Sequence, residues 1–187
     1  IVAPAFTMMM ALGSMVGGGG CALIAQTMGE GDSDRVSLYS SLCCWGSVMF
    51  GVIFAVVVLF GKNAILGFLG ANEEMWSYAG TYLSILALGA PVMIFTTAFG
   101  NIVRAEGAVK EGMVGNLIST VTNMVLDQLF ILVLPFGVSG AAVATVLGNL
   151  AGAGYLIRYV QKKSSSLSLS PKLAAAAPFE LRQVVAI

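Results

Sequence analysis

Long runs of uncharged, apolar residues constrain this chain more than any other feature of its sequence. Residues 1–29 contain no charged side chain, and four further apolar runs follow near 36–60, 77–103, 112–134 and 138–160. About 20 such residues cross the roughly 30 Å hydrocarbon core of a bilayer as an α-helix. The pattern predicts an all-α fold, a polytopic membrane helix bundle with about five transmembrane helices.

Composition excludes several classes of soluble protein. Hydrophobic residues make up 58% of the 187 residues and charged residues only 10%, with a net charge of zero and no histidine. We therefore expect the lipid bilayer as a partner and no nucleic-acid surface, since that would need clustered positive charge. No nucleophile with a base and no cofactor fingerprint is apparent, so we expect neither an enzyme nor a bound cofactor. The three cysteines match no metal or disulfide spacing and are interpreted as small buried hydrophobes.

The segments between the apolar runs are short and are predicted to be turns. They are residues 30–35, 61–76, 104–111 and 135–137. Residues 1–160 then form one bundle, and residues 161–187, rich in Lys, Ser and Pro, are predicted to be a surface linker that enters a further helix near 178–187. Because the sequence starts at Ile1 inside an apolar run, we expect a fragment that works with the remainder of the same chain.

The distribution of basic residues predicts the orientation of the bundle. Lys and Arg near the ends of spans stay on the cytoplasmic side, and a five-span reading puts eight of them on one side and Lys62 alone on the other. We therefore expect a multi-pass protein of the plasma or inner membrane, with residues 161–187 in the cytoplasm. The eight are Arg35, Arg104, Lys110, Arg158, Lys162, Lys163, Lys172 and Arg182.

Glycine and proline mark two places where helices could bend. Gly17, Gly18, Gly19 and Gly20 are consecutive in the first run, and each weakens a helix by about 1 kcal/mol relative to alanine. Pro91 lies in the middle of the third run, where it removes a backbone hydrogen bond and favours a kink. Both features suit a moving carrier, but close helix contacts in a rigid bundle need the same residues.

Asp127 is the residue that points most directly to function. A carboxylate inside a span costs roughly 2.5–3.5 kcal/mol on insertion scales, so its presence needs a reason. It lies about 10 Å from the outer end of the fourth run at 1.5 Å per residue. Asn123, Thr120 and Asn116 precede it by four, seven and eleven residues, so all four share one helix face. This stripe is predicted to line a cavity.

A second polar face is predicted on the fifth run, where Thr145 and Asn149 are one turn apart. The short connection PFGVSG makes the two runs antiparallel neighbours, so their polar faces are expected to meet. Carboxylate, amide and hydroxyl oxygens are ligands for a small hard cation, and a desolvated carboxylate can instead hold a proton. Asp127 and Asn123 are thus candidate ligands for sodium, with Thr145 beside them; interhelical hydrogen bonding for packing alone is the alternative.

Charges at the ends of the runs leave two readings open. Arg104 and Glu106 in the segment RAEG could form a hydrogen-bonding cluster or be solvated loop charges. Lys162 and Lys163 are interpreted as markers of the cytoplasmic interface.

Four segments together carry a family resemblance: GGGGCALIAQTMGEGD, RAEG, NMVLDQLFI and GVSGAAVATVLGN. In this order they resemble the multidrug and toxic compound extrusion (MATE) transporters over residues 1 to about 160. The resemblance implies part of the first lobe, helices two to six, of a two-lobe, twelve-helix carrier.

The resemblance also implies an activity and a site. It suggests a cation-coupled antiporter that uses a proton or sodium gradient to export organic cations or amphipathic compounds by alternating access. In one branch of the family the first-lobe site uses an acidic residue, an asparagine and a threonine, which match Asp127, Asn123 and Thr145, together with a helix-one aspartate that these residues do not include. A lipid-linked saccharide flippase of the same superfamily and a non-transporting membrane scaffold are the alternatives.

Overall fold

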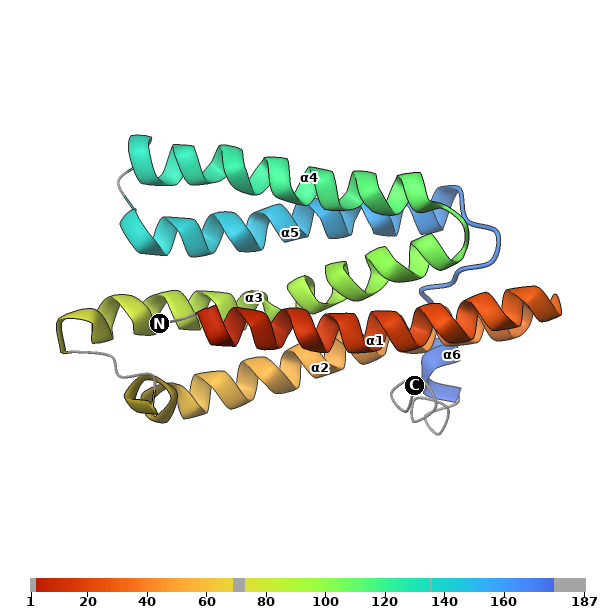
Figure 1. The fold of residues 1–187 in the computed structure, drawn as a ribbon, viewed down its shortest axis with the longest axis horizontal. Helices are drawn as coiled ribbons and strands as arrows, with labels where there is room; N and C mark the ends of the chain where they lie inside the picture. The colour runs from red at the N-terminus through yellow and green to blue at the C-terminus, as the bar shows by residue number, and fades with distance from the viewer. Residues whose placement is uncertain (1–2, 69–72, 135, 177–187) are drawn as a thin grey trace.

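The computed structural model describes residues 3–68, 73–134 and 136–176. Five long helices run up and down, and a short sixth helix follows (Figure 1). The number of long apolar helices confirms the prediction of five candidate membrane spans. The elements are α1 (Ala3–Glu30), α2 (Ser33–Phe68), α3 (Glu73–Ala105), α4 (Val109–Gln128), the π-helical segment η1 (Leu129–Val133), α5 (Gly137–Lys162) and α6 (Pro171–Ala176).

Some boundaries differ from those expected from the sequence. The predicted turn over 61–76 is wrong at both sides, because α2 continues to Phe68 and α3 already begins at Glu73. The segment is mostly apolar between Lys62 and Glu73, so it has the composition to extend both helices. In the linker, α6 forms at Pro171, where proline suits a first helical position. The further helix expected near 178–187 lies outside the described residues.

The turn between α1 and α2 shows why helices end at the charged segments. Gly31 has a φ of 76° and its N–H donates to the carbonyl of Met28, while the N–H of Asp32 donates to the carbonyl of Thr27. This is the pattern of a glycine C-cap. The Asp32 carboxylate then accepts the N–H of Arg35 at 3.1 Å and caps the start of α2.

Helix α3 is the centre of the bundle. It contacts α1 and α2 on one side and α4 and α5 on the other (Figure 1), and its buried residues Phe95, Phe99 and Ile102 join the largest apolar cluster. Within the described residues, α1 and α2 do not approach α4 or α5. The fold therefore consists of two helix pairs held apart by α3.

Small residues set the distances between helices, as expected where lipid supplies no hydrophobic drive. A Cβ on Gly51 of α2 would lie 2.3 Å from the Cα of Pro91, and one on Gly89 of α3 would lie 2.3 Å from Val146 on α5. A Cβ on Gly17 of α1 would likewise lie 2.8 Å from the Cα of Ala98. Backbone contact at these points leaves no room for a larger side chain.

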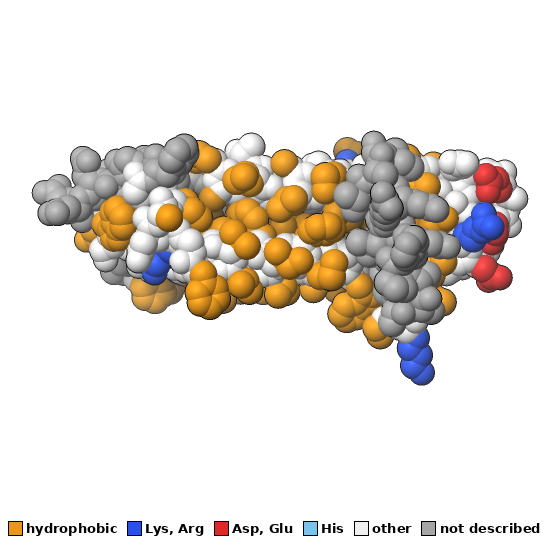
Figure 2. All heavy atoms as spheres, turned by 90° about the horizontal axis from the view of Figure 1, so that it is seen from below, with side chains coloured by type: hydrophobic (Ala, Val, Ile, Leu, Met, Phe, Trp, Pro, Cys, Tyr) orange, Lys and Arg blue, Asp and Glu red, His pale blue; other side chains and the backbone are white. Residues whose placement is uncertain are grey.

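The two ends of the bundle differ in charge. We call the end that carries the α1/α2 and α3/α4 turns and the start of the linker the linker end, and the other end the hairpin end. Figure 2 shows apolar side chains over the middle of one face, with acidic and basic side chains gathered beyond them at the linker end. Of the basic residues that the structure describes, only Lys62 lies toward the hairpin end.

Candidate functional site

Asp127 lies near the C-terminal end of α4, at the hairpin end of the bundle. Its side chain is half-buried, and one carboxylate oxygen, Oδ1, is buried with no hydrogen-bond partner among the described residues. Burying an ionised carboxylate without hydrogen-bond donors costs free energy in a low-dielectric environment. The unpaired oxygen is therefore an acceptor that a cation or a proton could occupy.

The backbone changes form two residues after Asp127. Residues 129–133 form the π-helical segment η1, and the N–H of Leu134 donates to the carbonyl of Leu129 at 3.0 Å. Such single π-turns are rare and are frequent at functional sites. The apolar sequence LFILV gave no signal of this change, because its hydrophobic pattern fits an α-helix equally well.

The asparagine one turn before Asp127 connects α4 to α5. The Nδ2 of Asn123 donates to the Oγ1 of Thr145 at 3.2 Å, and that hydroxyl in turn donates to the carbonyl of Ala141 at 2.9 Å. The arrangement leaves the Oδ1 of Asn123 as an acceptor. The structure thus brings Asn123 of α4 and Thr145 of α5 together, and Asp127 follows Asn123 by one helical turn.

A glycine on α5 makes this approach possible. A Cβ on Gly148 would lie 2.8 Å from the Cβ of Asn123 and 2.7 Å from the carbonyl oxygen of Ser119. Gly148 and Gly152 are four residues apart on one face of α5, a spacing typical of close helix contacts, and α4 is the partner here.

Asn149 does not join the group. Its Nδ2 turns back to the carbonyl of Thr145 on its own helix at 2.9 Å, and its backbone carbonyl accepts the hydroxyl of Thr96 on α3 at 3.2 Å. It therefore stabilises the α3–α5 contact in this structure. The expectation that both polar residues of α5 would meet α4 is met by Thr145 alone.

The remaining polar residues of the α4 stripe, Asn116 and Thr120, are exposed in an open groove of about 740 Å³. Arg104 of α3 and Lys110 also line the groove. Of all residues in α4, only Gly112 and Gly115 are buried, so most of this helix is left uncovered by the described chain. The polar stripe thus runs from an open groove to the half-buried carboxylate.

One residue near Asp127 was missed by sequence reasoning. Tyr82 of α3 lies in the neighbourhood of the Asp127 carboxylate and packs against a cluster that includes Ala142 of α5. Nothing in a single tyrosine within an apolar run signals this proximity. Among the described residues, no three His, Cys, Asp or Glu side chains cluster as they would around a transition metal.

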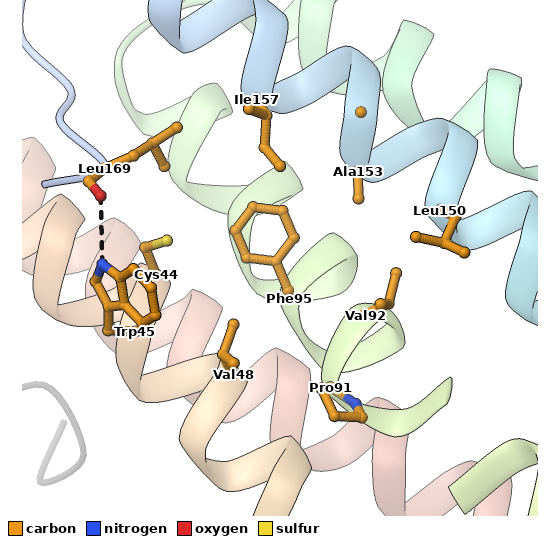
Figure 3. Close-up of a pocket in the computed structure, with 11 residues that line it drawn as sticks. Cys44, Trp45, Val48, Pro91, Val92, Phe95, Leu150, Ala153, Ile157 and Leu169 are labelled. Atoms are coloured by element: carbon orange, nitrogen blue, oxygen red, sulfur yellow. Dashed lines mark hydrogen bonds between the residues drawn. The ribbon is translucent and has the colours of Figure 1, made fainter. Parts of the chain in front are cut away.

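A second, entirely different cavity lies between α2, α3 and α5. It has a volume of about 440 Å³, and Figure 3 shows the side chains of Trp45, Pro91, Phe95 and Ile157 around it. The indole Nε1 of Trp45 donates to the carbonyl of Leu169 at 3.3 Å, which fixes the linker over one end. Its lining carries no charge, so it can hold hydrocarbon but cannot select an ion. The full lining is Cys44, Trp45, Val48, Pro91, Val92, Phe95, Leu150, Ala153, Gly154, Ile157 and Leu169.

The residues predicted to permit helix bending lie in continuous helices. Figure 1 shows α3 changing direction near its middle, and Pro91 is the proline inside that helix. In α1, the side-chain positions of Gly17 and Gly20 abut Ala98 of α3 and Cys43 of α2, while Gly18 faces open space. Gly19 is buried as well. Gly17 and Gly20 therefore serve close helix contacts; movement at these positions remains a prediction.

The RAEG segment forms a hydrogen-bonding cluster at the linker end, although Arg104 is not the partner of Glu106. Glu106 accepts the hydroxyls of Tyr159 at 3.1 Å and of Ser164 at 2.5 Å. Glu111, in the first turn of α4, accepts the hydroxyl of Tyr155 and pairs with Lys163 at 3.2 Å. Lys163 thus does more than mark an interface.

The linker itself is fixed by α2. The hydroxyls of Ser40 and Ser41 donate to the carbonyl of Ser168 at 3.2 and 3.1 Å, and Ser37 donates to that of Ser166 at 2.8 Å. Sequence reasoning assigned no role to these serines, because serines within an apolar run usually bond to their own helix.

Comparison with known proteins places this arrangement among transporters. The family model MatE matches residues 1–129. The multidrug export protein MepA of Staphylococcus aureus strain NCTC 8325 is 33% identical over 171 residues, which cover 91% of this chain and 38% of the relative. MepA of Staphylococcus saprophyticus is 31% identical over 167 residues, 89% of this chain and 37% of the relative. The chain therefore spans less than two-fifths of the length of these relatives.

Solved structures show the same fold. A multidrug resistance MATE family transporter of the MOP superfamily in an outward-facing conformation superposes with a TM-score of 0.88 at 25% identity, covering all of this chain and 42% of the other. An inward-facing structure of a transporter described in the same words gives a TM-score of 0.92 at 24% identity, again over all of this chain and 42% of the other. At that identity the second likeness supports the fold alone.

Proposed function

Because this chain belongs to the MatE family, a family of transporters and not of enzymes, we propose that it forms part of one lobe of a cation-coupled drug exporter. The relatives in Staphylococcus are multidrug export proteins. We propose the same class of cargo here: small organic cations or other amphipathic compounds, exported in exchange for a proton or sodium ion. The linker end would face the cytoplasm, which agrees with its basic residues.

The observation that carries this proposal is the orphaned oxygen of Asp127 beside a polar pair that bridges two helices. The free oxygens of Asp127 and Asn123 are hard ligands of the kind that sodium prefers, and Thr145 holds the asparagine in place. A carboxylate is also a group that can carry a proton, so a proton is the alternative coupling ion at this position. The coupling ion is cargo in this scheme and not a resident cofactor.

The polar stripe of α4 connects this site to the open groove, whose last lining residue on α4, Thr120, precedes Asn123 by three positions and Asp127 by seven. The stripe offers a path for competition between the ion and an organic cation. The exposed stripe of Asn116 and Thr120 offers hydrogen-bonding groups, and Met113 and Leu117 on the same groove offer apolar contact. Arg104 and Lys110 line the groove at the linker end, so an amphipathic cation would be repelled from there and attracted along the stripe toward the Asp127 carboxylate. Occupation of that carboxylate by a proton or sodium would weaken this attraction, which couples the two fluxes.

Efflux by the full-length protein tests the proposal. Cells or vesicles expressing it are loaded with ethidium, and release is followed under a defined proton or sodium gradient. We expect Asp127→Asn to lower the rate of gradient-driven efflux at least tenfold, because a neutral amide cannot exchange a cation. The amount of protein inserted in the membrane should be unchanged. Asp127→Glu is the matched control and should keep part of the activity. Undiminished coupled efflux in Asp127→Asn would reject the site.

Two further measurements complete the same experiment. Labelling of Ser165→Cys by an impermeant thiol reagent only after membrane disruption would agree with a cytoplasmic linker. If the unmodified protein releases ethidium at the same rate with and without the ion gradient, the scaffold alternative is favoured over a carrier.

A further inference from the structure

A small polar pocket at the linker end has no part in the transport scheme. It encloses about 140 Å³ between the first turn of α4 and the last turns of α5. Three basic residues face one acidic residue in its lining, which is an unusual excess of charge in a chain with so few charged residues. The lining consists of Glu111, Tyr155, Arg158, Tyr159, Lys162 and Lys163.

The hydrogen bonds of the pocket show which charges are already neutralised. Glu111 is satisfied by Tyr155 and Lys163, and the hydroxyl of Tyr159 is committed to Glu106. Arg158 and Lys162 form no salt bridge with any acidic group that the structure describes. Two cationic side chains, together with the unused N–H groups of Lys163, are therefore available to an anion.

The surface that leads away from the pocket is apolar. Gly154, Ala151 and Leu147 precede Arg158 by four, seven and eleven residues and share its face of α5. Gly154 and Leu147 are exposed, and apart from the adjacent backbone of α5 no heavy atom comes within 4 Å of a Cβ placed on Gly154. This face of α5 therefore carries two cations, unpaired within the described residues, at the linker end and, toward the middle of the bundle, an apolar track formed by Gly154, Ala151 and Leu147.

We infer that this pocket binds the phosphate of an anionic phospholipid, with an acyl chain along the apolar track of α5. Arg158 and Lys162 provide charge-assisted hydrogen bonds to the phosphate oxygens, since guanidinium and ammonium groups are the usual phosphate donors. Basic pockets between membrane helices at an interface are suited to such headgroups. Tyr155 and Tyr159, fixed by the two glutamates, form the walls at the level where tyrosine is enriched in membrane proteins.

The lipid would hold α4 and α5 together at one end without touching the candidate ion site at the other. The inference does not depend on the transport proposal, because its readout is lipid binding. A free inorganic phosphate shares the headgroup chemistry but would gain nothing from the apolar track.

Lipid titration of the delipidated, detergent-solubilised full-length protein tests the inference. Phosphatidylglycerol, phosphatidylcholine and inorganic phosphate are added separately, and binding is followed by native mass spectrometry and by the rise in melting temperature. We expect phosphatidylglycerol to bind and stabilise, and the double variant Arg158→Gln/Lys162→Gln to weaken that binding roughly 10- to 30-fold, the effect of two interfacial charges. Lys62→Gln/Lys172→Gln removes the same charge elsewhere and should change the affinity less than threefold.

Several outcomes would overturn it. Equal phosphatidylglycerol binding by the unmodified protein and the double variant would do so, as would equal protection by phosphatidylcholine. Protection by inorganic phosphate as strong as that by phosphatidylglycerol would make the pocket an anion site without a lipid. If the double variant does not fold, Arg158→Lys replaces it: it keeps the charge and should retain binding within about threefold, whereas Arg158→Gln should not.

Discussion

The acidic residues near the two ends of α4 differ in whether their carboxylate oxygens have hydrogen-bond donors. At the linker end, Glu106 and Glu111 each accept two side-chain hydrogen bonds, from tyrosine, serine or lysine. At the hairpin end, Asp127 keeps a buried oxygen for which the described residues provide no donor. The same functional group thus serves as a cross-link in one place and is left open in the other.

Under the proposed function, this difference distinguishes the two structural acids from the candidate site better than burial does. All three side chains are half-buried, so solvent exposure alone would not distinguish them. A carboxylate whose oxygens are already paired contributes to stability and has nothing left to offer a passing cation. An unpaired one lowers stability and persists where it has another use, which is the usual pattern at functional sites.

The contact between α4 and α5 can be broken at Gly148. Alanine there would place its Cβ 2.7 Å from the carbonyl of Ser119 and 2.8 Å from the Cβ of Asn123, so α4 and α5 must separate. We expect a loss of about 1–3 kcal/mol in the free energy of unfolding, typical of overpacking. Thermal unfolding of the purified full-length protein, calibrated by chemical denaturation, measures it.

Gly154 on the same helix provides the matched control. No heavy atom beyond the neighbouring backbone lies within 4 Å of a Cβ placed there. Gly154→Ala should be neutral or stabilise by about 0.5–1 kcal/mol, because alanine favours the helix. Equal effects of the two substitutions would show that Gly148 does not set the helix distance.

Glu106→Gln sharpens the comparison at the linker end. The amide keeps one acceptor oxygen but loses the negative charge that Tyr159 and Ser164 now bond. Hydrogen bonds to charged groups contribute about 1.5–3 kcal/mol, so we expect the free energy of unfolding to fall by about 1–2 kcal/mol, measured as a lower melting temperature. Glu30→Gln removes the same charge at an exposed position and should have little effect; an equal loss there would indicate a general charge effect.

The five helices follow from the sequence because each apolar run must satisfy its backbone hydrogen bonds internally in lipid. The end of α1 was also accessible to prediction, since Gly31 and Asp32 carry recognised capping chemistry. The extension of α2 to Phe68 was not, because an apolar stretch next to isolated charges is compatible with either a turn or a longer helix.

The candidate site was only partly predictable. Helical spacing correctly predicted that Asn123 faces Thr145, because this contact depends only on the short connection between two neighbouring helices. It could not show that Asn149 turns back on its own helix, nor that Tyr82 approaches from α3, because both depend on the rotation of packed helices. The links from Glu106 to Tyr159 and Ser164 join residues more than 50 positions apart, and no local pattern encodes them.

The smallest expected effect is the most informative, because it concerns the stability of Asp127→Asn and not its transport. Asparagine has nearly the shape of aspartate, and the replaced oxygen has no donor to lose. Removal of a poorly solvated charge should leave the melting temperature unchanged or slightly higher. Thermal unfolding of the purified full-length variant, in parallel with Glu106→Gln, measures this. A fall as large as that of Glu106→Gln would mean that Asp127 is a packing residue, and the contrast between the two ends of α4 would disappear.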